Sequence, residues 1–344
     1  MIKNEKFKNA INNIPQKVPP IWFMRQAGRY HSHYQNMRKK YSFIELCKNS
    51  DLASDVAIGP INEFDYDIAI LFSDILFPLD SLGLGLNYNP GPTFSNLLSK
   101  NTSGLNKPLD EIENDLKFQT DALIKTRKKL PKNKSLVGFV GGPWTLLSYG
   151  MGISKKSQIR NLHQEKTIEY ILYEKLFPII KSSISNQLKN KAEIVYIFDT
   201  SAKQLEKNYF IEKYIKFMKD NIFNIFKDKT AYFCKNNPIL NENNINQKYN
   251  LAGIVYGQED GFIESVKRTN KGFVQGNFNP ISLTKPFLDF KIDFDSFKNK
   301  LLNINVQNRK GLICSLSHGV LPNTNEYNVK YFIEEIRKEF EESE

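Results

Sequence analysis

The chain has 344 residues, of which 40% are hydrophobic, and this is enough for one large domain or two of medium size. It contains no run of 18 apolar residues, so no transmembrane helix is expected, and the polar segment 1–17 lacks the apolar centre of a signal peptide. Cys47, Cys234 and Cys314 are odd in number and widely separated, which predicts reduced core thiols in a cytoplasmic protein.

The net charge of +11 has two interpretations. One is an anionic partner, either a nucleic acid or a polyacidic small molecule. The other is a general over-use of Lys, Asn and Ile, in which the excess Lys only solvates helices. The Lys residues are scattered along the chain and no nucleic-acid motif is visible, so we expect no nucleic-acid partner.

Eight short apolar runs are predicted as strands, in chain order 21–24, 68–72, 135–140, 193–198, 230–234, 251–256, 272–275 and 311–316. Most are continuously apolar, as expected for parallel strands that are covered on both faces. Helical patterning lies between them, for example at 109–129, 165–188, 208–226, 262–267 and 294–302, and a terminal helix is predicted over 327–340.

This alternation predicts an α/β fold, namely a (β/α)8 TIM barrel in which residues 1–344 form a single domain. A doubly wound open sheet is the alternative, but no Gly-x-Gly-x-x-Gly follows any predicted strand. Residues 81–94, rich in Gly and Pro, predict a β-hairpin excursion after strand two. Residues 150–158 form a small-residue loop that is suited to a mobile flap.

Two arginines follow the first predicted strand, where residues 24–30 read Met-Arg-Gln-Ala-Gly-Arg-Tyr. A guanidinium binds two carboxylate or phosphate oxygens at once and stays charged at any working pH. The small residues between Arg25 and Arg29 let the backbone come close to a ligand. The segment therefore predicts an anion clamp at the end of a strand.

Polar residues also follow other predicted strands, and in a barrel these strand ends meet on one face. Asp74 follows the second strand, Tyr149 comes after the third, Asp199 and Thr200 follow the fourth, and His318 follows the eighth. Together with the clamp they would line one cleft. Each has a structural alternative: the two aspartates as helix caps, the histidine as a core residue and the tyrosine as a packing residue.

The sequence predicts no metal site. His31 and His33 form a His-x-His pair, but no third ligand lies near them in the sequence, and both are interpreted as solvent-facing residues at the start of a helix.

Five segments make the chain resemble the uroporphyrinogen decarboxylase family of haem biosynthesis, and they run nearly from end to end. They are Trp22-Phe23-Met24-Arg25-Gln26-Ala27-Gly28-Arg29-Tyr30, Phe72-Ser73-Asp74-Ile75-Leu76, Gly141-Gly142-Pro143-Trp144-Thr145-Leu146, Gln275-Gly276-Asn277 and His318-Gly319. The first is the signature of the family, and the order and spacing of the others agree with it.

The resemblance implies a (β/α)8 barrel, a homodimer and an enzyme that needs no metal or organic cofactor. The implied reaction converts the four acetate side chains of uroporphyrinogen III to methyl groups, giving coproporphyrinogen III and carbon dioxide. The family motifs imply that Arg25 and Arg29 bind substrate carboxylates, that Gln26 contributes through the same loop and that Arg38 lies near the site.

The same resemblance implies that Asp74 lies under the centre of the macrocycle and accepts hydrogen bonds from the pyrrole N–H groups, while Tyr149 and His318 line the cleft. Chemistry agrees with this assignment. A pyrrole protonated on a ring carbon can accept the electron pair that decarboxylation leaves, and a fixed carboxylate stabilises the resulting cation. The proton donor is open: Arg25 stands where the mechanism of the family is drawn with an arginine, whereas His318 and Tyr149 are better acids.

Departures from the family pattern lie in the second half of the chain. Thr200 stands where the family usually has Ser and keeps the hydroxyl, while residues 253–256 lack an expected Asp and Trp. Two alternatives therefore stay open. One is a non-catalytic paralogue that only binds porphyrinogens. The other is a corrinoid- or folate-linked methyltransferase on the same barrel, which would need a thiolate-rich zinc site.

Overall fold

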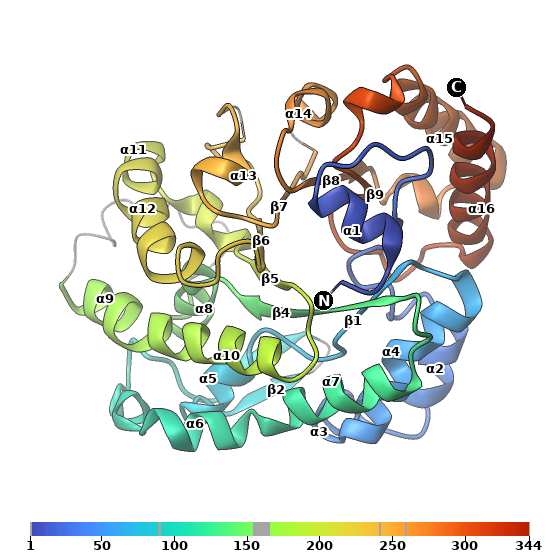
Figure 1. Ribbon diagram of the computed structural model, residues 1–344. Coiled ribbons are helices and arrows are strands. Elements are labelled where there is room, and N and C mark those ends of the chain that lie inside the picture. Colours follow the sequence, from blue (N-terminus) through green and yellow to red (C-terminus); the bar gives the residue numbers. More distant parts are fainter. Residues whose placement is uncertain (1, 89–90, 154–165, 241, 259, 344) are drawn as a thin grey trace.

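The computed structural model describes residues 2–88, 91–153, 166–240, 242–258 and 260–343, which form a parallel sheet curled into a barrel and surrounded by helices (Figure 1). The sheet has seven strands in the order β1-β4-β5-β6-β7-β8-β9, all parallel to their neighbours. They are β1 (Ile68–Ile70), β4 (Ser135–Gly141), β5 (Val195–Phe198), β6 (Thr230–Phe233), β7 (Gly253–Val255), β8 (Phe273–Phe278) and β9 (Leu312–Leu316). The predicted barrel is confirmed, and the doubly wound alternative is wrong.

The eighth position of the barrel is closed by a single bridge instead of a strand. Ile21 pairs in parallel with Cys314 of β9, and the Asp67 N–H donates to the Ile21 carbonyl at 3.0 Å on the other side. The prediction of a strand over 21–24 is wrong beyond Ile21. Pro20 has no N–H that could join a strand ladder. A turn begins at Phe23, and the Gln26 N–H donates to the Phe23 carbonyl to close it.

Buried polar side chains cross the barrel between the apolar strand residues. The Tyr196 hydroxyl donates to Oε1 of Gln275 at 2.9 Å, Nε2 of Gln275 donates to the Ser315 hydroxyl at 3.2 Å, and this hydroxyl donates to the Trp22 carbonyl at 2.7 Å. All four residues are fully buried, and the rings of Trp22 and Tyr196 meet edge to face at 4.9 Å. The chain of bonds ties the bridge segment to β5, β8 and β9, and it pairs the buried polar side chains of Tyr196, Gln275 and Ser315.

Helices cover the outside of the barrel. The main ones are α1 (Glu5–Ile11), α2 (Ser32–Arg38), α3 (Phe43–Lys48), α4 (Ser50–Phe64), α5 (Phe77–Ser81), α6 (Leu109–Asp115), α7 (Lys117–Lys129), α8 (Pro143–Gly150), α9 (Lys166–Tyr170), α10 (Phe177–Lys189), α11 (Lys207–Tyr209), α12 (Ile215–Met218), α13 (Ile245–Lys248), α14 (Phe262–Arg268), α15 (Phe287–Leu302) and α16 (Glu326–Glu342). The predicted segments 109–129, 262–267, 294–302 and 327–340 are confirmed as helical, with a break at Leu116. None of the described helices combines the length and the apolar character that crossing a bilayer requires.

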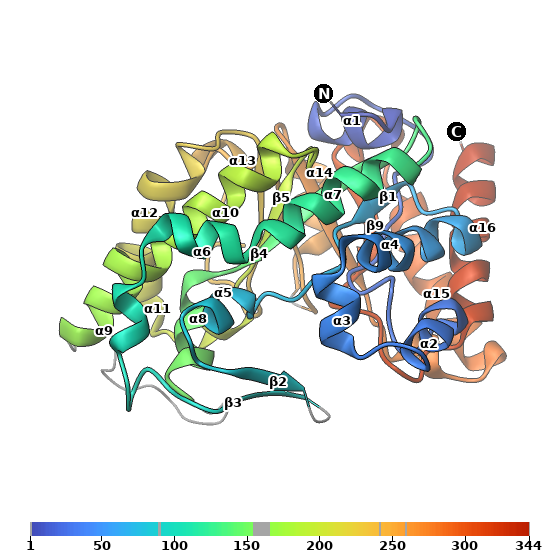
Figure 2. The same cartoon turned by 90° about the horizontal axis from the view of Figure 1, so that it is seen from below.

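The hairpin predicted after strand two is confirmed. Strands β2 (Leu86–Tyr88) and β3 (Pro92–Phe94) pair antiparallel, and Figure 2 shows them at the end of the barrel opposite α1. The hairpin is fixed to the barrel through Tyr88, whose ring meets that of Phe43 on α3 edge to face at 4.6 Å. Of the predicted small-residue loop, residues 154–158 lie outside the described residues.

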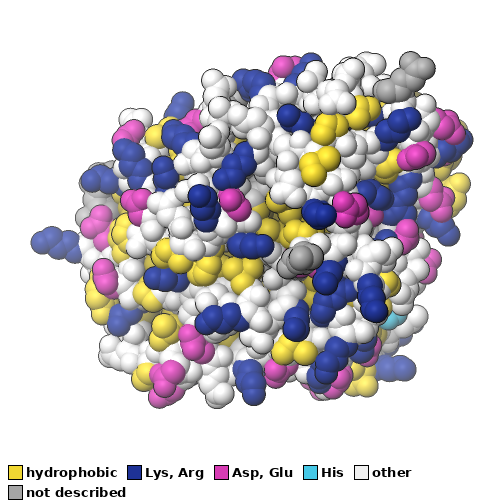
Figure 3. Space-filling view, in the orientation of Figure 1, with side chains coloured by type: hydrophobic (Ala, Val, Ile, Leu, Met, Phe, Trp, Pro, Cys, Tyr) yellow, Lys and Arg dark blue, Asp and Glu magenta, His cyan; other side chains and the backbone are white. Residues whose placement is uncertain are grey.

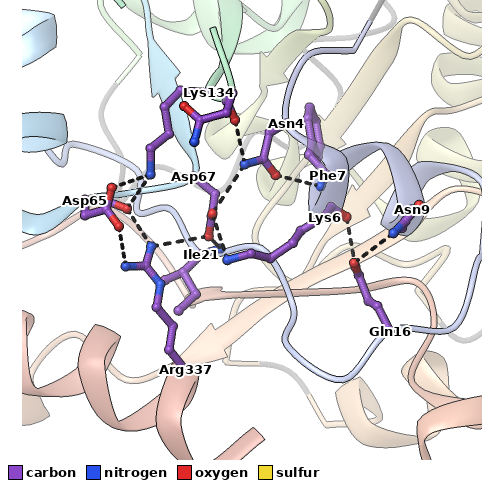
Figure 4. A network of polar contacts seen from close by, with 11 residues as sticks. Asn4, Lys6, Phe7, Asn9, Gln16, Ile21, Asp65, Asp67, Lys134 and Arg337 are labelled. Carbon is purple, nitrogen blue, oxygen red and sulfur yellow. Dashed lines mark hydrogen bonds and ion pairs between the residues drawn. The ribbon is translucent and has the colours of Figure 1, made fainter. Parts of the chain in front are cut away.

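A network of ion pairs joins the segments at the amino end of the barrel (Figure 4). Asp67, directly before β1, has a side chain that is 3% exposed. One carboxylate oxygen binds Nζ of Lys6 at 3.0 Å, and the other accepts the backbone N–H of Ile21 at 2.9 Å. Arg337 of α16 binds the neighbouring Asp65 at 2.6 Å. This end of the barrel thus carries the charges that hold the first segment and the last helix together, a role typical of the amino-terminal face.

The three cysteines are free and buried, as predicted. The charge distribution agrees with the interpretation in which the excess Lys residues are scattered and solvate helices. On the face seen in Figure 3, Lys and Arg side chains are interspersed with Asp and Glu.

Candidate functional site

The turn after the bridge brings Arg25 over the carboxyl ends of the strands. Arg25 has φ +60°, in the left-handed region that L residues rarely adopt. The N–H of Val320 donates to the Met24 carbonyl at 2.9 Å, so this turn is fixed to the segment that follows β9. Arg25 itself is exposed at the strand ends. A strained backbone in this position, held by neighbours from another part of the chain, is typical of a functional site.

Asp74 lies just past β1, on the same face. Its Oδ1 accepts the backbone N–H of Leu76 at 2.9 Å. The alternative that it caps the next helix is wrong, because α5 begins at Phe77 with Leu76 as its N-cap. Burial raises the pKa of the Asp74 carboxyl, while the Leu76 N–H, the Tyr88 hydroxyl and the charge of Arg25 lower it. The carboxyl therefore stands in a poorly solvated position that favours binding of hydrogen-bond donors.

Tyr149 on α8 is electrostatically coupled to the same pair. Burial raises the pKa of the Tyr149 hydroxyl, the charge of Asp74 raises it further, and Arg25 lowers it. Tyr149 is half-buried and packs against the hydrophobic core. It stays protonated at neutral pH and can donate a hydrogen bond.

His318 completes the group from the end of β9. One ring nitrogen, Nδ1, lies 3.0 Å from the Gly319 carbonyl. Burial lowers the pKa of His318, the hydrogen bond to Gly319 opposes this, and the positive charges of Lys235 and Arg25 lower it further. His318 is therefore neutral at neutral pH, with Nδ1 as the donor toward Gly319 and Nε2 as an acceptor. Arg25 acts electrostatically on all three of the other residues.

Two residues near Asp74 were missed by the sequence reasoning. Tyr88 comes from the hairpin, and burial followed by the charge of Asp74 raises the pKa of its hydroxyl. Cys47 on α3 is fully buried, and burial followed by the charge of Asp74 raises the pKa of its thiol. The hairpin after strand two was the available signal for Tyr88; no pattern pointed to Cys47.

The other predicted arginines lie farther out. Arg29 and Arg38 are exposed, and Nη1 of Arg38 donates to the Tyr41 carbonyl at 2.6 Å. Tyr34 connects the two: burial raises the pKa of its hydroxyl, while Arg38, which is hydrogen-bonded to it, and Arg29 lower it. The two guanidiniums therefore flank one tyrosine and leave donors facing solvent.

Gln26 and Thr200 are placed differently from the clamp. Gln26 is 1% exposed, and its Nε2 donates to the Ile68 carbonyl of β1 at 3.1 Å, so it fixes the loop to the barrel from inside. Its Oε1 has no partner among the described residues. Thr200 begins a 3₁₀ turn, Thr200–Gln204, at the end of β5 and is half-buried.

Asp199 is a structural residue: it holds the N-cap position of the turn Thr200–Gln204, but its side chain makes no capping hydrogen bond there. It is completely buried, and its carboxylate accepts hydrogen bonds from the backbone N–H and hydroxyl of Thr145, both at 2.9 Å, and from the hydroxyls of Tyr214 and Tyr232. Burial raises the pKa of this carboxyl, and the four donors oppose the shift. Asp199 thus links β5 to the start of α8, the helix that carries Tyr149.

The histidine pair lies at the start of α2, as predicted, but the solvent-facing position is wrong for His31. His31 is 1% exposed instead of solvent-facing, because its ring packs against Phe64 at 5.1 Å, and the ring of His33 occupies the space beside Gly59 of α4. Within the described ranges, no three His, Cys, Asp or Glu side chains are grouped so that they could hold a metal ion.

Comparison with known proteins identifies the relatives of this chain. The family model described as uroporphyrinogen decarboxylase (URO-D) matches residues 2–339. A uroporphyrinogen decarboxylase of Helicobacter acinonychis is 35% identical over 336 residues, covering 92% of this chain and 93% of the relative. One from Orientia tsutsugamushi is 35% identical over 351 residues, covering 96% and 98%.

Among solved structures, a methyltransferase from Methanosarcina mazei aligns with a TM-score of 0.73 over 99% of both chains, at 15% identity. At this level of identity the likeness shows the fold alone.

Proposed function

Because the chain belongs to the uroporphyrinogen decarboxylase family and is therefore a carboxy-lyase, we propose that it removes carbon dioxide from all four acetate side chains of uroporphyrinogen III. The product is coproporphyrinogen III. The single observation that supports this most strongly is the packing of Arg25 against Gly319, next to His318, with the Val320 N–H bonded to the Met24 carbonyl. Family membership also supports the proposal that the protein is a homodimer, that it acts in the cytoplasm and that it uses no cofactor.

Substrate binding is assigned to the arginines. The substrate has eight carboxylates, so cations at the rim of the cleft match its periphery. Arg25 at the centre, with Arg29 and Arg38 beside Tyr34, holds acetate and propionate groups, and the Thr200 hydroxyl donates to one more. Gln26 acts indirectly, since it fixes the clamp loop to β1.

Asp74 is assigned the central chemical role. In the free protein burial makes ionisation of this carboxyl costly, and pyrrole N–H groups would reverse this by donating to the ionised form. Once ionised beneath the macrocycle, Asp74 stabilises the cation that forms when a pyrrole ring carbon is protonated. One such well-placed group contributes roughly 3–4 kcal/mol to the transition state.

The remaining two residues handle protons and orientation. Tyr149 is protonated and donates a hydrogen bond toward the cleft. Nε2 of neutral His318 accepts a hydrogen bond. Because the ring is uncharged, it adds no second positive charge beside Arg25. Arg25 binds the departing carboxylate and takes part in the proton-transfer step.

An anaerobic assay under reducing conditions tests the proposal. The protein is incubated with uroporphyrinogen III, the tetrapyrroles are oxidised, and porphyrins with eight to four carboxylates are separated. We expect complete conversion to the four-carboxylate product. Tight binding without loss of carboxylates would show the non-catalytic paralogue instead, and stoichiometric zinc together with methyl transfer would show the methyltransferase.

A further inference from the structure

A groove on the outside of the barrel lies between α6, α7 and α10, on the other side of the wall from the cleft. Figure 2 shows these helices side by side along β4. The groove has a volume of about 260 Å³ and is lined mostly by polar side chains, among them Glu113, Gln119, Ser182, Ser183 and Gln187. At its outer end Ser182 of α10 donates to Glu113 of α6, so the two helices are hydrogen-bonded across it.

A narrow cavity lies beside this groove. It has a volume of about 10 Å³ and is lined by Asp74, Gln119 and Ser183 together with apolar residues such as Phe139 and Leu146. Gln119 and Ser183 also line the groove, so the two spaces are adjacent and share a wall. A volume of this size holds about one water molecule.

Polar groups along this route are suited to water. Gln119 is 7% exposed, and its Nε2 donates to the hydroxyl of Ser73 at 3.0 Å. Ser73 directly precedes Asp74 in the chain. Gln187 is 1% exposed, and its Nε2 donates to the Phe139 carbonyl at 2.8 Å. Its Oε1 has no hydrogen-bond partner in the described parts of the chain. A buried acceptor of this kind beside a polar groove is normally satisfied by water.

We propose that the groove, Gln119 and Ser183 form a water passage through the barrel wall that supplies protons to the Asp74 end of the cleft while substrate covers its mouth. This inference rests on the proposed function. In each decarboxylation the bond between the methylene carbon and the carboxylate breaks, carbon dioxide leaves, and a C–H bond to a solvent-derived proton takes its place. Four turns therefore consume four protons beneath one bound macrocycle.

Gln119 and Ser183 are positioning residues in this scheme, since they hold the water and do not touch the reacting atoms. Ser183→Leu fills the narrow cavity, and Gln119→Met removes the hydrogen bond to Ser73 at nearly constant volume. Ser185→Leu is the matched control, because Ser185 lies on the same helix but does not line either space. Thermal unfolding of each variant establishes that it is folded.

The kinetic readout is kcat, KM and the solvent deuterium isotope effect on kcat with uroporphyrinogen III. We expect Ser183→Leu and Gln119→Met to lower kcat by about tenfold or more, with KM unchanged and a larger isotope effect, because proton supply becomes rate-limiting. Ser185→Leu should match the wild type. A wild-type kcat in both passage variants would overturn the proposal. A fall in kcat with an unchanged isotope effect would also overturn it, because that result is expected if the passage serves only as an exit for carbon dioxide.

A crystal structure separates this proposal from the proposed function. Ordered water between Gln119 and Asp74 in the wild type, absent in Ser183→Leu, supports the passage even if the wild type does not decarboxylate uroporphyrinogen. A narrow cavity without water in the wild type refutes it, whatever the activity.

Discussion

The side chain of Arg25 lies directly against the backbone of Gly319. A Cβ built on Gly319 would be 2.5 Å from Cδ of Arg25, 2.8 Å from Cγ and 3.1 Å from Nε. Real Cβ atoms do not approach that closely, so only glycine at 319 leaves room for the guanidinium over the cleft. The two residues are 294 positions apart in the chain, and the bond between the Val320 N–H and the Met24 carbonyl holds them together.

Gly319→Ala should therefore displace Arg25 without touching its charge. We expect kcat/KM for uroporphyrinogen III to fall by about 10–100-fold, because a shift of an ångström in a binding group is costly. Gly91→Ala is the matched control, since a Cβ there meets nothing within 4 Å. Equal activity of the two variants would show that the position of Arg25 is not critical.

Asp74→Asn should abolish turnover more than binding, since it removes the charge and keeps the shape. We expect kcat to fall by about 10²–10³-fold with a KM close to that of the wild type, which is the loss typical of one electrostatic stabiliser. Single-turnover decarboxylation and equilibrium binding of uroporphyrinogen measure the two effects separately. A near-normal rate in this variant would refute the cation-stabilising role.

Asp74 should also make the free protein less stable as the pH rises. Its folded-state pKa is raised from the ordinary 3.8, so the folded state binds more protons than the unfolded chain between that value and the folded pKa. The contribution of this carboxyl to stability is then complete below pH 3.8 and is lost as the pH rises through the folded pKa. Asp74→Asn should be more stable than the wild type at neutral pH in urea unfolding, with no such difference in acid.

Asp67 should matter for stability and not for catalysis, because it lies at the opposite end of β1 from Asp74. Asp67→Ala leaves partly exposed Lys6 without its partner and the buried N–H of Ile21 without an acceptor, which costs about 1–3 kcal/mol. The exposed pair of Asp51 with Lys125 provides the control, and Asp51→Ala should cost less than about 1 kcal/mol. Urea unfolding measures both values, and kcat at low temperature should be unchanged in each.

Local patterns in the sequence determined most of the secondary structure. Seven of the eight predicted strands form, and the hairpin lies at its predicted place, because apolar runs and Gly-Pro turns act over a few residues. The first strand ended at Ile21 because a turn begins at Phe23, whose carbonyl accepts the Gln26 N–H instead of a bond from a neighbouring strand.

For the candidate site, the sequence by itself determined the residue types and the strand ends that carry them, since parallel strands place their carboxyl ends on one face. Only the tertiary structure decided which of them meet. It separated half-buried Asp74 from Asp199, which four donors enclose, and it brought Tyr88 and Cys47 near Asp74, and Gly319 against Arg25, from distant parts of the chain. Such contacts form only when the barrel closes. A local sequence pattern covers a few neighbouring residues, so it does not encode the distance between residues that are far apart in the chain.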